Sequence, residues 1–174
     1  MQRPMNLSKA IFINTYSYLI TTDGTGGSVE MKPTTIVELM TADHTKILKL
    51  LHDVEKSIDI ELVSLMKVFD TFEWELEKHI FTEEKAIFSS YNPKNIAEGY
   101  KMVPELIQQH NEILNRVRIM RKDLMWNKPV QFHEFREFIT AHKTFEEASL
   151  YPKLDQELTV AQKDEIIKKI REIA

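Results

Sequence analysis

The sequence predicts an all-α protein, an antiparallel up-down-up-down four-helix bundle with a short additional helix at its C-terminal end. Of the 174 residues, 43% are hydrophobic and 29% charged, and only 4 are glycine and 6 proline, a composition typical of helical proteins. Between residues 37 and 150 the apolar positions recur in alternating steps of three and four, as in helices that bury one face in a bundle. The connections between these stripes are short, which favours antiparallel neighbours.

The chain divides into two unequal parts. Residues 1–30 show no helical stripe, and three of the four glycines lie within residues 21–28. We expect these 30 residues to be a flexible N-terminal extension, with Met31 as an alternative start of the protein. Residues 31–174 are long enough to bury one core and form the predicted domain.

The first two helices are predicted from a capping signal and from the breaks around them. Thr35 followed by Glu38 is a capping-box pattern that opens a helix ending near residue 57. Asp59 is a suitable N-cap for the second helix. Turn-forming residues at 91–93 mark its end.

The second half of the chain contains two more helices and a shorter segment. The third helix ends before residues 127–129, and the fourth begins near Pro129 and stops at Pro152. A capping-box pattern at Thr159 and Gln162 then opens an amphipathic segment. We expect this segment to pack across the outside or the end of the bundle.

Six polar residues occupy stripe positions that are otherwise apolar. They are His44, His79, Glu83, His110, His142 and Glu146. Residues four apart on a helix differ by only about 40° in direction, so each His-x-x-x-Glu pair points one imidazole and one carboxylate into the same space. Glu84 and Glu147, one position later, turn about 140° away and should face more water.

The spacing of the four histidines predicts that they meet in one layer. Successive histidines are separated by 35, 31 and 32 residues, and a predicted turn falls roughly midway in each interval. In an antiparallel hairpin, residues equally far from the turn lie side by side. All six polar side chains can therefore lie at one height in the bundle.

A metal centre is the chemistry that best explains six such side chains in a core. Burying an ionised carboxylate is costly unless it is paired or coordinates a metal. The chain has no cysteine, which excludes disulfides, thiolate zinc sites and ordinary iron–sulfur ligation. Six N/O donors suit two metals, with two histidines on each and the carboxylates bridging. Iron or manganese is preferred, zinc is a substitute, and an oxo or hydroxo bridge would leave positions open to O2, NO, peroxide or water.

These residues resemble the hemerythrin, or HHE cation-binding, family over residues 31–154. The matching elements are Asp43-His44, His79-x-x-x-Glu83, His110, and His142-x-x-x-Glu146 followed by Leu150-Tyr151-Pro152. The resemblance implies an oxo- or hydroxo-bridged di-iron site. The oxygen carriers of the family have a fifth histidine where this chain has Leu114, and the spacing of their last acidic ligand would select Glu147 instead of Glu146. The sequence is more similar to the four-His, two-Glu branch linked to iron–sulfur cluster repair, nitric oxide handling and sensing.

Three functions follow as hypotheses. The first is a di-iron protein that binds, senses or reduces O2 or NO; the second is iron storage, donation or sensing. The third is a metal-free helical signalling bundle, which would need an accessible histidine. A net charge of −4 and a pI near 5.9 argue against nucleic acid, and no apolar run is long enough to span a membrane, so we expect a cytoplasmic protein. The remaining histidines, His52 and His133, are expected on the helix flank and at the surface.

Overall fold

A computed structural model of the chain describes residues 35–91 and 96–173, and these residues contain helices and no strand. The α-helices are α1 (Ile36–Lys56), α2 (Leu62–Thr82), α3 (Ile96–Met125), α4 (Phe132–Phe145), α5 (Tyr151–Glu157) and α6 (Val160–Ile173). Shorter segments join them: η1 (Glu83–Ile87) and η3 (Glu146–Leu150) are π-helical, and η2 (Phe88–Ser90) is 3₁₀-helical. The predicted N-terminal extension lies outside the described residues.

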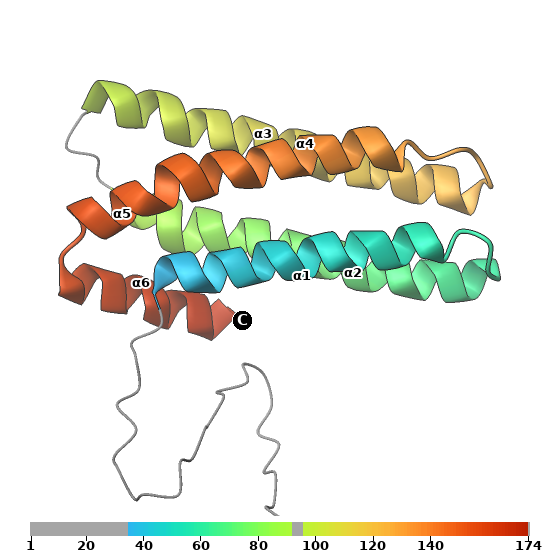
Figure 1. The fold of residues 1–174 in the computed structure, drawn as a ribbon, viewed down its shortest axis with the longest axis horizontal. Helices are drawn as coiled ribbons and strands as arrows, with labels where there is room; N and C mark the ends of the chain where they lie inside the picture. Colours follow the sequence, from blue (N-terminus) through green and yellow to red (C-terminus); the bar gives the residue numbers. More distant parts are fainter. Residues whose placement is uncertain (1–34, 92–95, 174) are drawn as a thin grey trace, which may run out of the picture. The chain divides into compact units, whose positions relative to one another are not determined.

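Each of the first four α-helices runs antiparallel to the next one along the chain, and the α1–α2 and α3–α4 turns lie at the same end of the bundle (Figure 1). α1 contacts α2 and α4, and α3 contacts the same two helices, so each long helix has a helical neighbour on two sides. α6 packs on α1, α2 and η1. The predicted four-helix bundle with an extra C-terminal helix is confirmed.

Local signals explain several of the helix ends. At the start of α1, the Thr35 hydroxyl accepts from the Glu38 N–H and the Glu38 carboxylate accepts from the Thr35 N–H, so the predicted capping box is present. The predicted pattern before α6 is also present, with Gln162 accepting from the Thr159 N–H at 2.9 Å. Asn127 ends the α3 region in a left-handed conformation with φ of 51°, which asparagine tolerates well.

Three predicted boundaries are wrong. Asp59 is not the N-cap of α2, because that helix begins after Glu61. α4 starts at Phe132, three residues after Pro129. Pro152 does not stop the helical course, because it lies in the first turn of α5, where a residue without an N–H is tolerated.

The core of the described residues consists of two apolar clusters. The turn-side cluster extends toward the α1–α2 and α3–α4 turns, and it comprises Ile47, Leu51, Val54, Leu65, Phe69, Phe72, Leu76, Ile80, Ile113, Val117, Met120, Leu124, Phe132, Phe135 and Ile139. The α6-side cluster comprises Ile36, Leu39, Met40, Ala86, Ile87, Phe88, Met102, Leu106, Leu150, Tyr151, Leu154, Ile166 and Ile170. Their positions along the four helices leave room for a polar layer between them.

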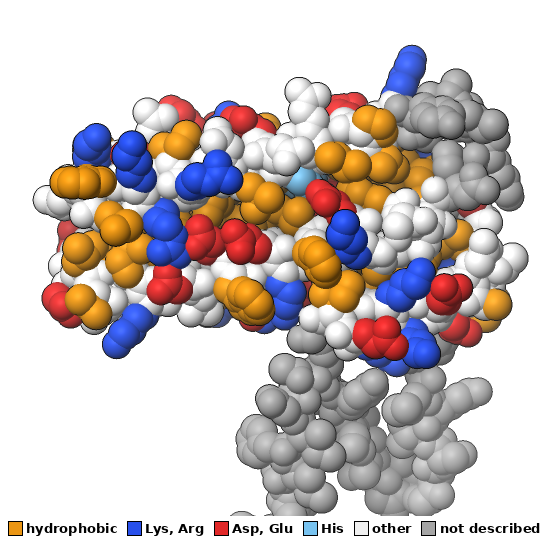
Figure 2. All heavy atoms as spheres, turned by 180° about the vertical axis from the view of Figure 1, so that it is seen from behind, with side chains coloured by type: hydrophobic (Ala, Val, Ile, Leu, Met, Phe, Trp, Pro, Cys, Tyr) orange, Lys and Arg blue, Asp and Glu red, His pale blue; other side chains and the backbone are white. Residues whose placement is uncertain are grey.

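On the face shown in Figure 2, acidic and basic side chains are interspersed with hydrophobic ones, which adjoin one another in places. Arginine side chains connect neighbouring helices: Arg121 on α3 pairs with Asp70 and Glu73 on α2, and Arg136 on α4 pairs with Glu55 on α1. Within the described part of the chain, no helix is long and apolar enough to cross a membrane.

Candidate metal centre

The layer between the two apolar clusters is filled by six polar side chains, each 0–5% exposed. They are His44 (α1), His79 (α2), Glu83 (η1), His110 (α3), His142 (α4) and Glu146 (η3). The structure thus brings together all six residues that the sequence singled out. Their binding of metal stays a prediction.

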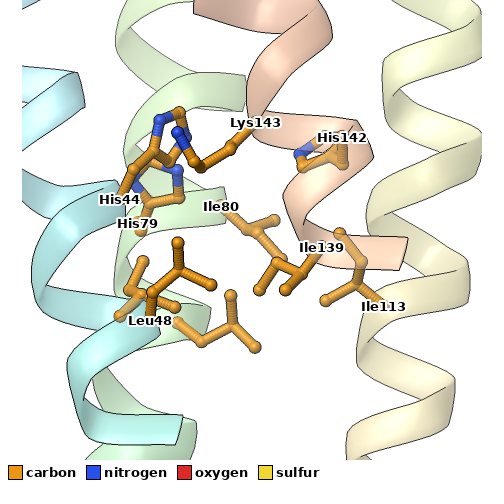
Figure 3. A pocket seen from close by; sticks show the side chains of 10 residues that line it. His44, Leu48, His79, Ile80, Ile113, Ile139, His142 and Lys143 are labelled. Carbon is orange, nitrogen blue, oxygen red and sulfur yellow. The ribbon is translucent and has the colours of Figure 1, made fainter. Parts of the chain in front are cut away.

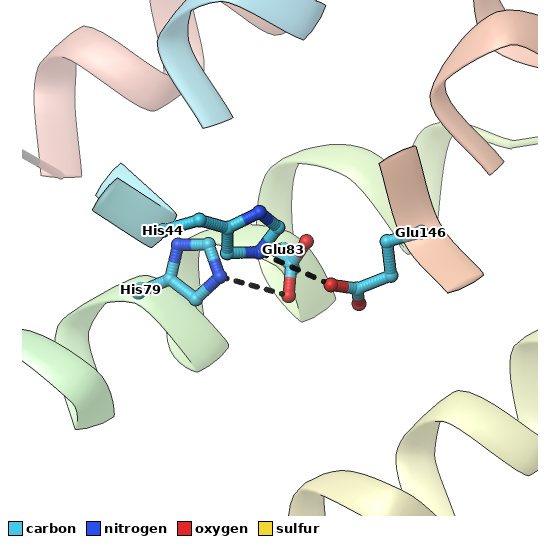
Figure 4. A group of neighbouring side chains, drawn as sticks. All are labelled: His44, His79, Glu83 and Glu146. Atoms are coloured by element: carbon cyan, nitrogen blue, oxygen red, sulfur yellow. Dashed lines mark ion pairs between the residues drawn. The ribbon is translucent and has the colours of Figure 1, made fainter. Parts of the chain in front are cut away.

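The six side chains form two overlapping groups of four. One group is His44, His79, Glu83 and Glu146, and the other is Glu83, His110, His142 and Glu146. Within each group, one nitrogen or oxygen atom per residue lies within 4.8 Å of the other three. The first group is drawn in Figure 4, where both imidazoles turn toward the two carboxylates. Each group can hold one cation, and both glutamates can serve two cations at once.

The atoms that face the centre have no hydrogen-bond partner among the described residues. They include Nε2 of all four histidines, Oε2 of Glu83 and both carboxylate oxygens of Glu146. Each such buried, unpaired group costs about 1–3 kcal/mol, and more where it is charged. Two cations between them would satisfy all of these atoms. Imidazole and carboxylate donors also suit iron, so the residues present fit a two-metal centre.

The outer nitrogens of the histidines face a second ring of polar groups. His44 Nδ1 lies 2.9 Å from Glu147 Oε1. His110 Nδ1 lies 3.1 Å from Glu84 Oε1. His142 Nδ1 lies 2.8 Å from the side-chain carbonyl oxygen of Gln109. An acceptor at Nδ1 keeps the proton there and leaves the Nε2 lone pair directed at the centre, which is the tautomer a metal needs.

The fourth histidine has the longest outer contact. Asp43 Oδ2 lies 3.8 Å from His79 Nδ1, within ion-pair distance and beyond a hydrogen bond. The sequence places Asp43 in a motif beside His44, but its pattern did not predict that Gln109, Glu84 or Glu147 contacts a histidine. Each of these four residues directly precedes or follows one of the six central residues, and that adjacency is the signal that could have identified them.

The carboxylates of Glu84 and Glu147, which follow the central glutamates, are more exposed to solvent than those of Glu83 and Glu146, as predicted. The side chains of Glu84 and Glu147 are 32% and 25% exposed, whereas Glu83 and Glu146 are fully buried. The burial identifies Glu146, and not Glu147, as the carboxylate of the fourth helix that faces the centre. Glu147 instead contacts a histidine from outside.

A π-helical turn begins at each central glutamate. The Glu83 carbonyl accepts from the N–H of Phe88, and the Glu146 carbonyl accepts from the N–H of Tyr151, both five residues later. The wider turn brings an aromatic ring against a histidine of a neighbouring helix. Phe88 stacks on His110 with ring centroids 5.5 Å apart. Such π-helical turns within α-helices occur frequently at functional sites.

The protonation equilibria of the centre follow from burial and from the two carboxylates. Burial alone would lower the pKa of His110, but Glu146 and Glu83 raise it to about 10. The pKa of His44 is likewise raised by Glu146 and Glu83 against the effect of burial. His142 differs, because burial and the neighbouring His110 hold its pKa below the usual value. In the metal-free centre, His44 and His110 therefore hold protons that a bound metal would replace.

A small cavity of about 10 Å³ lies beside the centre, toward the turn-side cluster (Figure 3). It is lined by His44, Ile47, Leu48, Leu76, His79, Ile80, Ile113, Ile139, His142 and Lys143. Three of the central histidines thus border a space that is otherwise mostly aliphatic. The volume is about that needed for one water-sized molecule.

The other two histidines are at the surface. His52 is 50% exposed and His133 is 82% exposed. Neither contributes to the centre, as the sequence predicted.

Comparisons with known proteins agree with this geometry. The family model described as hemerythrin HHE cation binding domain matches residues 35–154, which span the bundle from the start of α1 to α5. No curated protein matches the chain, and no solved structure does.

Proposed function

Because the chain belongs to the hemerythrin HHE cation-binding family, we propose that it holds two iron ions and binds, senses or reduces O2 or NO at them. The observation that carries the proposal is the pair of four-residue groups sharing Glu83 and Glu146. A site for one metal would need only one such group. The second group, built from the same two carboxylates, supports a second metal position beside the first.

In this proposal the six residues have distinct roles. His44 and His79 bind one metal, His110 and His142 bind the other, and the two glutamates bridge them. Each metal receives two nitrogens and two carboxylate oxygens from the protein, which leaves coordination positions open on iron. Two iron ions so held supply electrons and open coordination positions for a small ligand.

The surroundings of the centre favour a small apolar ligand. The adjoining cavity of about 10 Å³ has room for one small molecule, and Ile113, Ile139 and Leu76 form part of its wall. Diatomic gases match that size and polarity, whereas a larger substrate would require the helices to separate. Peroxide is a third small ligand that such a site can accept.

Two observations argue against bulk iron storage and against a metal-free signalling bundle, and neither applies to iron donation or sensing. Iron donation or sensing would use the same six residues and differs only in how readily metal leaves. Bulk iron storage needs a large cavity, and the cavity beside the centre is far too small for it. A phosphotransfer bundle needs an accessible imidazole, whereas the four central histidines are at most 5% exposed.

The proposal is tested by iron content and by nitric oxide. Protein loaded with ferrous iron without air should retain about two irons per chain and give a new optical and electron paramagnetic resonance spectrum with NO. His142→Ala should lower the iron content, while His133→Ala, a change at the exposed surface, should leave it at two. Wild-type protein that retains no iron would overturn the metal centre, and iron-loaded protein without an NO adduct would overturn the proposed ligand.

A further inference from the structure

The two halves of the centre are related by an approximate twofold repeat. Residues 79–88 and 142–151 share the pattern His-x-x-x-Glu-Glu-x-x-aliphatic-aromatic, and both contain a π-helical turn. Each half also serves a histidine on a neighbouring helix. In the first half, Glu84 and Phe88 contact His110. In the second half, Glu147 and Tyr151 contact His44.

One hydroxyl group breaks this repeat at the bridging carboxylates. Tyr151 donates a hydrogen bond of 2.5 Å to Glu83 Oε1 in the buried core. The residue at the equivalent position is Phe88, which has no hydroxyl to offer Glu146. Accordingly, both Glu146 oxygens lack a hydrogen-bond partner among the described residues, whereas on Glu83 only Oε2 does.

The two glutamates consequently present different atoms to the histidines. Glu83 presents the same oxygen, Oε2, to His79 Nε2 at 3.4 Å and to His110 Nε2 at 3.2 Å. Glu146 presents Oε2 to His44 at 3.2 Å and Oε1 to His142 at 3.3 Å. Glu83 therefore offers a single oxygen to both metal positions, whereas Glu146 offers a different oxygen to each position.

We propose that Tyr151 is a positioning residue that holds Glu83 so that Oε2 alone is shared by the two metals. The inference rests on the proposed function, since it concerns how the bridging residues meet the metals. Tyr151 is fully buried, and a hydrogen bond to a carboxylate is among the stronger kinds. Turning Oε1 toward a metal would leave the tyrosine hydroxyl unpaired in a dry core, which is unfavourable.

The experiment compares wild-type protein with Tyr151→Phe, which removes the hydroxyl and keeps the ring. Both are loaded with ferrous iron, and their iron–iron separation is measured by X-ray absorption and their Glu83 binding mode in crystals. In wild type we expect Glu83 to bind through one oxygen. In Tyr151→Phe we expect it to bind through both, with a longer iron–iron separation and iron loss to a chelator about tenfold faster.

Phe88→Tyr is the reciprocal variant, because it places a hydroxyl on the Glu146 side of the repeat. We expect it to shift Glu146 toward binding through one oxygen. If Tyr151→Phe does not fold, this variant alone tests whether the hydroxyl sets how the glutamate binds. Variants that hold two irons with unchanged carboxylate modes and separations would overturn the role of Tyr151 and leave the proposed function intact. Wild-type protein that binds no iron would overturn both.

Discussion

At the scale of single residues, the centre depends on which atom of each side chain faces inward. Each central histidine presents Nε2 to the centre, and three of them hold Nδ1 against an oxygen of Glu147, Glu84 or Gln109. Helical phase alone predicted the six inward residues, because His and Glu four apart share a direction. Phase could not predict the outer partners, since each pairing depends on how a neighbouring helix is placed, which no single-helix pattern contains.

Glu147→Gln tests one of these outer partners. The amide can still accept from His44 Nδ1, but it removes the negative charge that strengthens the imidazole as a donor. We expect iron binding to weaken by about tenfold, measured by competition with a chelator. Glu137→Gln, at a 68% exposed position on α4, is the control and should match wild type. An unchanged affinity in Glu147→Gln would show that the outer carboxylate has no influence on the metal.

Leu114→His tests the position where oxygen carriers of the family have a further histidine. Leu114 is half-buried against the turn-side cluster, one helical turn beyond His110. We expect the new imidazole to add a ligand to the metal bound by His110 and to slow iron release to a chelator. Leu114→Gln controls for polarity and size and should not slow it. Equal release rates in Leu114→His and wild type would mean that this side chain does not reach the metal.

At the scale of helices, the sequence predicted which elements exist better than where they end. The stripes of α1 to α4 were correct because burial of one face dominates helix formation in a bundle. The helical course through Pro152 was not predicted, because a proline normally marks a stop, and here it falls in the first turn of α5 after a π-helical segment. The π turns were missed as well, since no composition or spacing distinguishes them from α-helix.

Glu75→Gln tests an ionic contact between α1 and α2. The Glu75 carboxylate accepts from Lys46 at 2.7 Å and from Lys78 at 3.0 Å. Burial alone would raise the pKa of Glu75, but the two lysines hold it below the usual 4.5. Because the folded pKa is lowered, the stabilisation is present above pH 4.5 and is lost as pH falls through the folded pKa.

In urea unfolding of metal-free protein at pH 7, Glu75→Gln should lower the free energy of unfolding by no more than about 1 kcal/mol. The difference from wild type should shrink below pH 4.5. Glu77→Gln, at an exposed position on the same helix, should show no such pH dependence. A difference that stays constant down to acid pH would contradict the ionic origin of the effect.

At the scale of the whole domain, a polar layer separates two apolar clusters. The clusters account for the stability of a bundle in the ordinary way, by burying aliphatic and aromatic side chains. The layer between them opposes folding when metal is absent, because the buried Nε2 atoms and the inward carboxylate oxygens have no hydrogen-bond partner among the described residues. We therefore expect metal binding and folding to be coupled.

Removing the metal should lower the melting temperature. At iron concentrations about 100 times the dissociation constant, binding adds about 2.7 kcal/mol, which corresponds to roughly 5–10 °C for a domain of this size. Calorimetry of iron-loaded and chelator-treated protein measures the shift. His133→Ala should show the same shift as wild type, whereas coincident melting curves with and without iron would contradict the coupling.

Anomalous diffraction at the iron edge, from crystals of iron-loaded protein, would locate the two metals that we propose the six inward side chains hold. We expect two anomalous peaks per chain, one beside Nε2 of His44 and His79 and one beside Nε2 of His110 and His142, with Glu83 and Glu146 in contact with both. A single peak in this layer, or peaks only at surface carboxylates, would contradict this proposal.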